Sequence, residues 1–101
     1  MKKICIVIYT HKHGIDLYPC TTENGALRCA AQTVLENLCE VYNEETIQHI
    51  KELIVEGELS DAINEYTEAV EHENIEINDF EITKGPTAKT LKEQATLLNS
   101  K

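Results

Sequence analysis

An unbroken apolar run near the start of the chain, residues 4–9, constrains the fold more than any other segment. Most of its residues are β-branched or aromatic, which is typical of a strand, and an unbroken run suits a strand covered on both faces. Gly14, after a polar pair, predicts a tight turn. The alternation over residues 15–18 predicts a second strand that ends at Pro19. The sequence therefore predicts a β-hairpin over residues 4–18, with the first strand in the centre of a sheet.

Three stretches of helical periodicity follow the hairpin. The first extends over residues 21–42, with a threonine cap at its start. The second begins at Asn43, a favoured N-cap residue, and ends at Gly57, a favoured left-handed cap. The third places its apolar stripe over residues 59–70. The sequence therefore predicts three consecutive helices.

Alternation returns over residues 74–83 and predicts a third strand. The apolar residues at 75 and 77 occupy odd positions, whereas those at 80 and 82 occupy even positions. Because a strand of period two cannot keep both pairs on one face, we expect a β-bulge at Asn78-Asp79, with a tight turn as the less favoured reading.

These elements define an α+β fold in the order β-β-α-α-α-β. We expect a small, mainly antiparallel, three-stranded sheet with helices packed on one face. Residues 1–83 form this single domain, and residues 84–101 form a lysine-rich C-terminal tail. Gly85-Pro86 separates the two, and apolar residues at 88, 91, 95 and 98 predict a short helix in the tail.

The charge is strongly negative and unevenly distributed. The net charge is −9 over the 101 residues; residues 1–83 hold five basic and seventeen acidic side chains, a net charge of −12, and residues 84–101 carry +3. An acidic body repels phosphate, so direct nucleic-acid binding is not expected. The chain has no apolar run long enough to span a membrane, and we expect a cytoplasmic protein without a membrane partner. A basic surface on another protein is the expected partner, and a homodimer is left open.

The four cysteines show no metal-binding spacing such as CxxC. We expect reduced, free thiols, with Cys5 buried in the first strand and Cys20, beside Pro19, the most reactive. No metal and no cofactor is predicted.

The polar turn of the hairpin is a candidate site formed by His11, His13, Asp16 and Cys20. Two histidines on one face of a strand could bind a metal ion, and a cysteine–histidine pair could act in nucleophilic catalysis. However, a zinc site needs three or four converging ligands, and no complete set of acid, base and nucleophile is present. We therefore predict no catalytic residues and no enzyme, and keep a metal- or His/Cys-dependent enzyme at this hairpin as the alternative.

The acidic residues provide a second candidate surface. Glu36 and Glu40 lie four residues apart on the first predicted helix, and Glu65 and Glu68 lie three apart on the third. Each spacing places two carboxylates on one helix face. The net charge of −12 also exceeds the magnitude of about 2–8 that keeps a small domain soluble. We predict that these four residues bind the partner.

Residues 4–83 resemble a group of small proteins from phages and other mobile elements. The resemblance is carried by the His-x-His-Gly-x-Asp turn at residues 11–16, by the alanine-rich helix and by the closing Ile-Glu-Ile strand at residues 75–77. It implies a genomic setting in which small acidic proteins often antagonise host defence. An inhibitor or anti-defence protein is the function expected from this resemblance.

Overall fold

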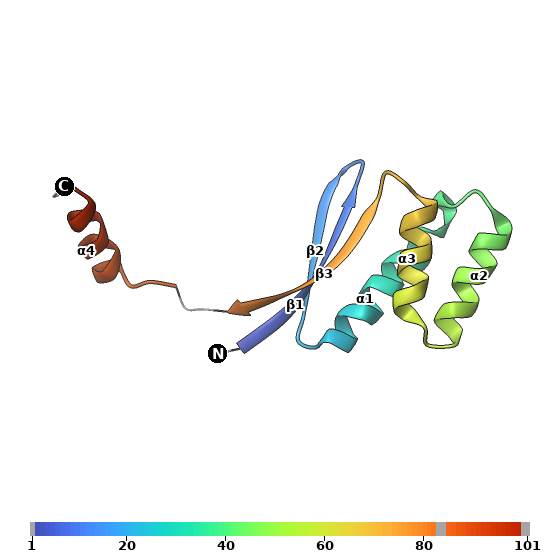
Figure 1. Cartoon of the computed structure of the whole chain (residues 1–101), viewed down its shortest axis with the longest axis horizontal. Coiled ribbons are helices and arrows are strands. Elements are labelled where there is room, and N and C mark those ends of the chain that lie inside the picture. Colours follow the sequence, from blue (N-terminus) through green and yellow to red (C-terminus); the bar gives the residue numbers. More distant parts are fainter. Residues whose placement is uncertain (1, 83–84, 100–101) are drawn as a thin grey trace.

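The structure, a computed structural model, describes residues 2–82 and 85–99. Its elements are β1 (Lys2–His11), β2 (Gly14–Cys20), α1 (Glu23–Glu36), the 3-10 helix η1 (Leu38–Glu40), α2 (Glu44–Val55), α3 (Leu59–Ala69), β3 (Asn74–Ile82) and α4 (Ala88–Asn99). The α+β class and the predicted element order are confirmed, including the C-terminal helix (Figure 1). The predicted boundary between residues 83 and 84 lies outside the described residues.

The sheet has the order β2-β1-β3, and both pairings are antiparallel. The apolar first strand is therefore central, as its composition predicts. The hairpin pairs His11 with Gly14 and continues to Cys5 opposite Cys20, so β2 includes Pro19 and does not end there. A proline is tolerated because β2 is an edge strand, where a nitrogen facing solvent removes no hydrogen bond from the sheet.

The expected bulge in β3 is absent from its described pairing. The register is continuous from Asn74 opposite Thr10 to Ile82 opposite Lys2. The change of parity instead means that the two halves of β3 put apolar side chains on opposite faces. Ile75 is buried beneath the helices, whereas Phe80 lies on the other face and is 45% exposed. The prediction was wrong because it assumed that only one face of the sheet takes apolar residues.

Helices cover only one face of the sheet, the one that carries the side chains of Val7 and Tyr9 (Figure 1). We call the other side the open face; its apolar residues are Ile4, Ile6, Ile8, Ile15, Leu17, Phe80 and Ile82. Ile4, Ile6 and Ile8 are only half-buried, and the remaining four are exposed. Among residues 2–82 and 85–99, the expectation that the first strand is covered on both faces is therefore not met.

The core lies between the covered face and α1 and α3. Three small or β-branched residues of α1, Ala26, Ala30 and Val34, are completely buried, and their size lets the helix approach the sheet closely. Tyr66 and Ala62 of α3 complete the centre of the core and are also completely buried. Ala69, predicted to lie on the same stripe, is exposed because α3 ends there.

The first helix is shorter than predicted, ending at Glu36 and not near Tyr42. Asn37 caps it: its backbone N–H donates to the carbonyl of Val34, and its side-chain amide donates to the carbonyl of Thr33 at 2.8 Å. Leaving the helix at this point buries both Leu38 and Val41, at the cost of leaving Tyr42 95% exposed.

The helical hairpin of α2 and α3 follows the predicted boundaries closely. The side chain of Asn43 accepts hydrogen bonds from the backbone N–H groups of Glu45 and Thr46, which caps α2. Gly57 has a φ of +84°, the left-handed conformation that lets the chain reverse into α3. Ile50 of α2 is completely buried in the common core.

The C-terminal helix α4 stands apart from the body (Figure 1). The molecule measures 64 × 27 × 18 Å and has a radius of gyration of 19.3 Å. A compact domain of this length has a radius of gyration of about 13 Å. Each described side chain of α4, residues 88–98, is exposed.

Candidate functional site

The hairpin turn brings together two of the residues predicted there, His11 and Asp16. The imidazole Nε2 of His11 lies 2.9 Å from Oδ2 of Asp16, and the backbone N–H of His13 donates to Nδ1 of His11 at 3.3 Å. In the tautomer that carries its proton on Nε2, His11 donates to Asp16 while its Nδ1 accepts from His13. Both imidazole nitrogens are thus engaged within the turn.

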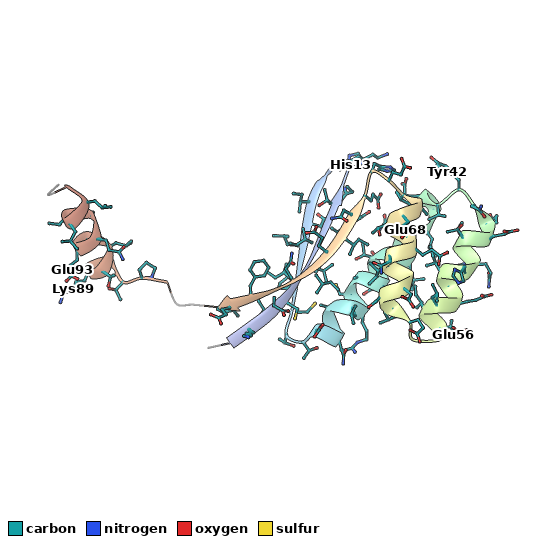
Figure 2. All side chains as sticks on the ribbon, viewed as in Figure 1. His13, Tyr42, Glu56, Glu68, Lys89 and Glu93 are labelled. Atoms are coloured by element: carbon teal, nitrogen blue, oxygen red, sulfur yellow. The ribbon has the colours of Figure 1, made fainter. Side chains whose placement is uncertain are left out.

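His11 also contacts the core through its ring. Its centroid lies 4.7 Å from that of Tyr9, and 6.2 Å from that of His13, which projects from the tip of the hairpin (Figure 2). His11 is half-buried by these contacts, whereas His13 is exposed. The arrangement is that of a turn stabilised by its own side chains.

The fourth predicted member, Cys20, is not part of this cluster. It lies at the far end of β2, opposite Cys5, six residues along the strand from Gly14. At about 3.4 Å per residue this separation is about 20 Å. The structure therefore does not bring the thiol of Cys20 within reach of His11 or His13.

Cys5, Cys20 and Cys29 lie near one another between the sheet and α1, and the environments of Cys5 and Cys29 do not favour a thiolate. The thiol of Cys5 donates to Oδ1 of Asp79 at 3.0 Å; this hydrogen bond and burial raise the pKa of Cys5 to about 11. Burial, and then the neighbouring Cys20, raise the pKa of Cys29. A reactive cysteine needs a lowered pKa, so Cys5 and Cys29 have the character of core residues.

A buried carboxylate, which the sequence analysis missed, lies at the same end of the sheet as the hairpin turn. Glu73 is 8% exposed, and its Oε1 accepts hydrogen bonds from the hydroxyl of Tyr9 at 2.7 Å and from that of Tyr66 at 2.6 Å. Burial, followed by the hydrogen bond to Glu73, raises the pKa of both tyrosines. The available signal was the presence of two tyrosines at core positions, because a buried hydroxyl needs a partner.

Glu73 also belongs to a group of three side chains that could hold a metal ion. Oε2 lies 3.8 Å from Nε2 of His72, and one ligand atom from each of Glu40, His72 and Glu73 lies within 4.8 Å of the other two. The hydroxyls of Tyr9 and Tyr66 hold the carboxylate of Glu73 in one orientation. Within residues 2–82 and 85–99, this is the one group of three that could hold a cation.

The predicted partner-binding carboxylates do not form two equivalent pairs. Glu36 is the last residue of α1 and is exposed, whereas Glu40 lies beyond the helix end in η1 and is half-buried. The four-residue spacing therefore does not place them on one helix face. Glu65 and Glu68 do share α3, and Glu68 is exposed on it (Figure 2).

Carboxylates from both helices of the hairpin surround His49 of α2. Its Nδ1 forms an ion pair with Oε2 of Glu65 on α3. The pKa of His49 is raised, first by the hydrogen bond to Glu65 and then by the negative charge of Glu65. The charges of Glu52 and Glu56 raise it further. The α2–α3 hairpin thus presents a negative surface, which we call the acidic surface: Glu52, Glu56, Glu65 and Glu68.

A cleft of about 270 Å³ lies between the first turns of α1 and α3. Leu27 and Arg28 line it on one side, and Glu58 and Asp61 line it on the other. Its volume is below the range of about 300–1,000 Å³ that is usual for small-molecule sites.

Comparisons of the chain with protein-family models, with curated proteins and with solved structures gave no match. In the two described segments, no helix is both long enough and apolar enough to cross a bilayer.

Proposed function

We propose that the protein is a cytoplasmic, non-enzymatic interaction module whose acidic surface binds a basic surface on another protein. The observation that carries this proposal is the clustering of carboxylates around His49: Glu65 pairs with it across the helical hairpin, and the charges of Glu52 and Glu56 also act on it. Such a cluster favours positive charge at this surface. The resemblance of the hairpin turn to proteins of phages and mobile elements supports a role as an inhibitor or anti-defence protein in that setting.

Charge on this surface acts mainly on the rate of association. Glu52, Glu56 and Glu68 are exposed, so they cost little to bring against a basic partner. Complementary potentials accelerate diffusional encounter, and exposed charges are screened beyond about 8 Å at physiological ionic strength. A basic partner is therefore expected to associate faster at low salt.

The experiment compares three double charge reversals of equal size. Glu52→Lys with Glu68→Lys alters the acidic surface. Glu36→Lys with Glu40→Lys alters the other predicted pair. The third variant, Glu81→Lys with Glu93→Lys, changes two exposed carboxylates outside the α2–α3 hairpin and controls for net charge.

The partner is first captured from cell extract with the wild-type protein, and its association rate is then measured with each variant. The first reversal should slow association at least about tenfold at low salt, and the third should have a much smaller effect. Equal slowing by all three variants would show that only net charge matters. An association rate indifferent to salt and to all reversals would reject the acidic surface.

The alternative, an enzyme at the hairpin, has less support from the geometry. Both nitrogens of His11 are engaged within the turn, and Cys20 lies about 20 Å away along β2. A nucleophile and a base must lie within hydrogen-bond reach of one another, and the described hairpin offers no such pair.

A further inference from the structure

The open face is a continuous apolar surface that nothing in the described chain covers. It combines residues from all three strands, since Ile8 pairs with Leu17 on one side and Ile4 pairs with Phe80 on the other. Leu17 is 60% exposed, Ile15 63% and Ile82 46%. Contiguous exposed apolar surfaces of this kind mark interaction sites.

The apolar run of β1 also indicates that the open face is packed against another apolar surface when the protein functions. A strand with one solvated face normally alternates between apolar and polar residues, as β2 does in part. In β1, however, Ile4, Ile6 and Ile8 occupy the positions that would then be polar. Their presence is accounted for when a second apolar layer packs on the open face.

Within the described residues, the helix α4 carries an apolar stripe that is exposed and lies outside the core cluster. Its stripe consists of Ala88, Leu91, Ala95 and Leu98, at helical spacing. Leu91 is 53% exposed and Leu98 is 70% exposed. Twelve helical residues extend over about 18 Å, and β1 from Ile4 to Thr10 extends over about 20 Å, so the lengths match.

The net charges of the tail and of the body are opposite in sign, which favours their association. Lys89 and Lys92 lie on α4, within a tail of net charge +3, whereas residues 1–83 carry −12. Glu76 lies on the open face itself, opposite Ile8. A basic amphipathic helix is therefore suited to this face.

We propose that α4 of one molecule packs on the open face of a second copy of the chain, and that the second copy makes the same contact in return. In the structure α4 lies beyond the end of β3 and away from its own sheet, in a molecule 64 Å long (Figure 1). This extension carries the helix toward a neighbouring molecule. Exchange of two identical contacts gives a closed dimer with twofold symmetry. The interface is distinct from the acidic surface, so the two proposals can fail independently.

The first test is the mass of the full chain in solution, measured by sedimentation over a range of concentrations. We expect a dimer, with twice the 11.4 kDa of one chain. Leu98→Glu should raise the dimer dissociation constant at least about tenfold, because it places a charge in the apolar stripe of α4. Leu97→Glu is the matched control, because Leu97 is equally exposed, at 69%, but lies on the opposite side of α4 from the stripe.

The second test changes the sheet side of the same contact. Leu17→Glu, on the exposed edge strand, should weaken the dimer like Leu98→Glu, and Leu35→Glu, on an exposed position of α1, should not. The Leu17→Glu and Leu98→Glu proteins are then mixed, one of them labelled with ¹⁵N. In the mixed dimer one intact helix meets one intact sheet, so native mass spectrometry should detect heterodimers even where each variant alone is monomeric.

A wild-type protein that stays monomeric overturns the proposal. Its radius of gyration then tells two cases apart: a value of about 13 Å means that α4 closes on its own sheet. A value near 19.3 Å means that α4 stays extended. A dimer that survives Leu98→Glu also overturns it, because another surface then holds the copies together. Failure of the mixed variants to form heterodimers excludes the exchange of α4. Since α4 contributes nothing to the core, the Leu98→Glu result does not depend on the stability of the body.

Discussion

The hydroxyl of Tyr66 donates a hydrogen bond of 2.6 Å to the carboxylate of Glu73 inside the core. Tyr66 is completely buried, and Glu73 is 8% exposed. The same carboxylate oxygen accepts from Tyr9 of the central strand. This contact ties the end of α3 and the segment that follows it to the sheet.

Removing one donor should leave the buried carboxylate underpaired. We expect Tyr66→Phe to lower the free energy of unfolding by about 1–3 kcal/mol, measured by urea denaturation. Tyr42→Phe is the control: Tyr42 is 95% exposed, so its change should stay within about 0.5 kcal/mol. Equal stability of Tyr66→Phe and wild type would show that the hydrogen bond contributes nothing net.

The ion pair between His49 and Glu65 should make stability depend on pH. The folded-state pKa of His49 lies above its unfolded value of 6.5. The stabilisation is therefore fully present below about pH 6.5 and is lost as the pH rises through the folded-state value. An NMR titration of the His49 imidazole should give a raised pKa that falls toward 6.5 in Glu65→Gln. Glu44→Gln, at the start of α2, should leave it unchanged, and an equal fall in both variants would contradict the assignment.

Thiol reactivity should follow the exposure seen in the structure, which changes the expectation for Cys20. Cys20 is half-buried between the sheet and α1, whereas Cys39 in η1 is exposed. We therefore expect Cys39 to react first with iodoacetamide and Cys5, buried and with a raised pKa of about 11, to react last. Mass spectrometry of timed samples gives the order. Labelling of Cys5 as fast as Cys39 in the native protein, and not only in denaturant, would contradict the burial of β1.

The hairpin histidines should be dispensable for folding. His11→Ala combined with His13→Ala removes the pair with Asp16 and the contact with Tyr9, all near the surface of the turn. We expect the free energy of unfolding to fall by no more than about 1 kcal/mol. Stoichiometric zinc in wild-type protein purified without chelator, lost together with folding in the double variant, would show that these histidines are metal ligands.

Local signals in the sequence were sufficient for most of the fold. An apolar run gave the central strand, Asn43 and Gly57 gave the limits of α2, and the helical spacing gave α3 and α4. Each depends on residues within a few positions of one another, whose backbone preferences act before any tertiary contact forms. Parts of the candidate site could also be predicted in this way, because His11 and Asp16 lie across a single tight turn.

Other features depended on residues far apart in the chain. Glu73 was one carboxylate among eighteen acidic residues, and its partner Tyr9 lies 64 positions away, so nothing local distinguished it. Likewise, α1 ends at Glu36 because leaving the helix there buries Leu38 and Val41 against distant elements. The helical pattern itself continued past that point.

The two faces of the sheet are the clearest feature that local sequence patterns did not determine. A period of two determined that Ile75 and Ile77 share one side of β3, and that Phe80 and Ile82 share the other. It did not determine which side the helices would cover, because that depends on how far α1 and α3 extend over the sheet. The sequence by itself thus determined the strands and their order in the chain, whereas only the tertiary structure decided which apolar residues entered the core and which remained on the open face.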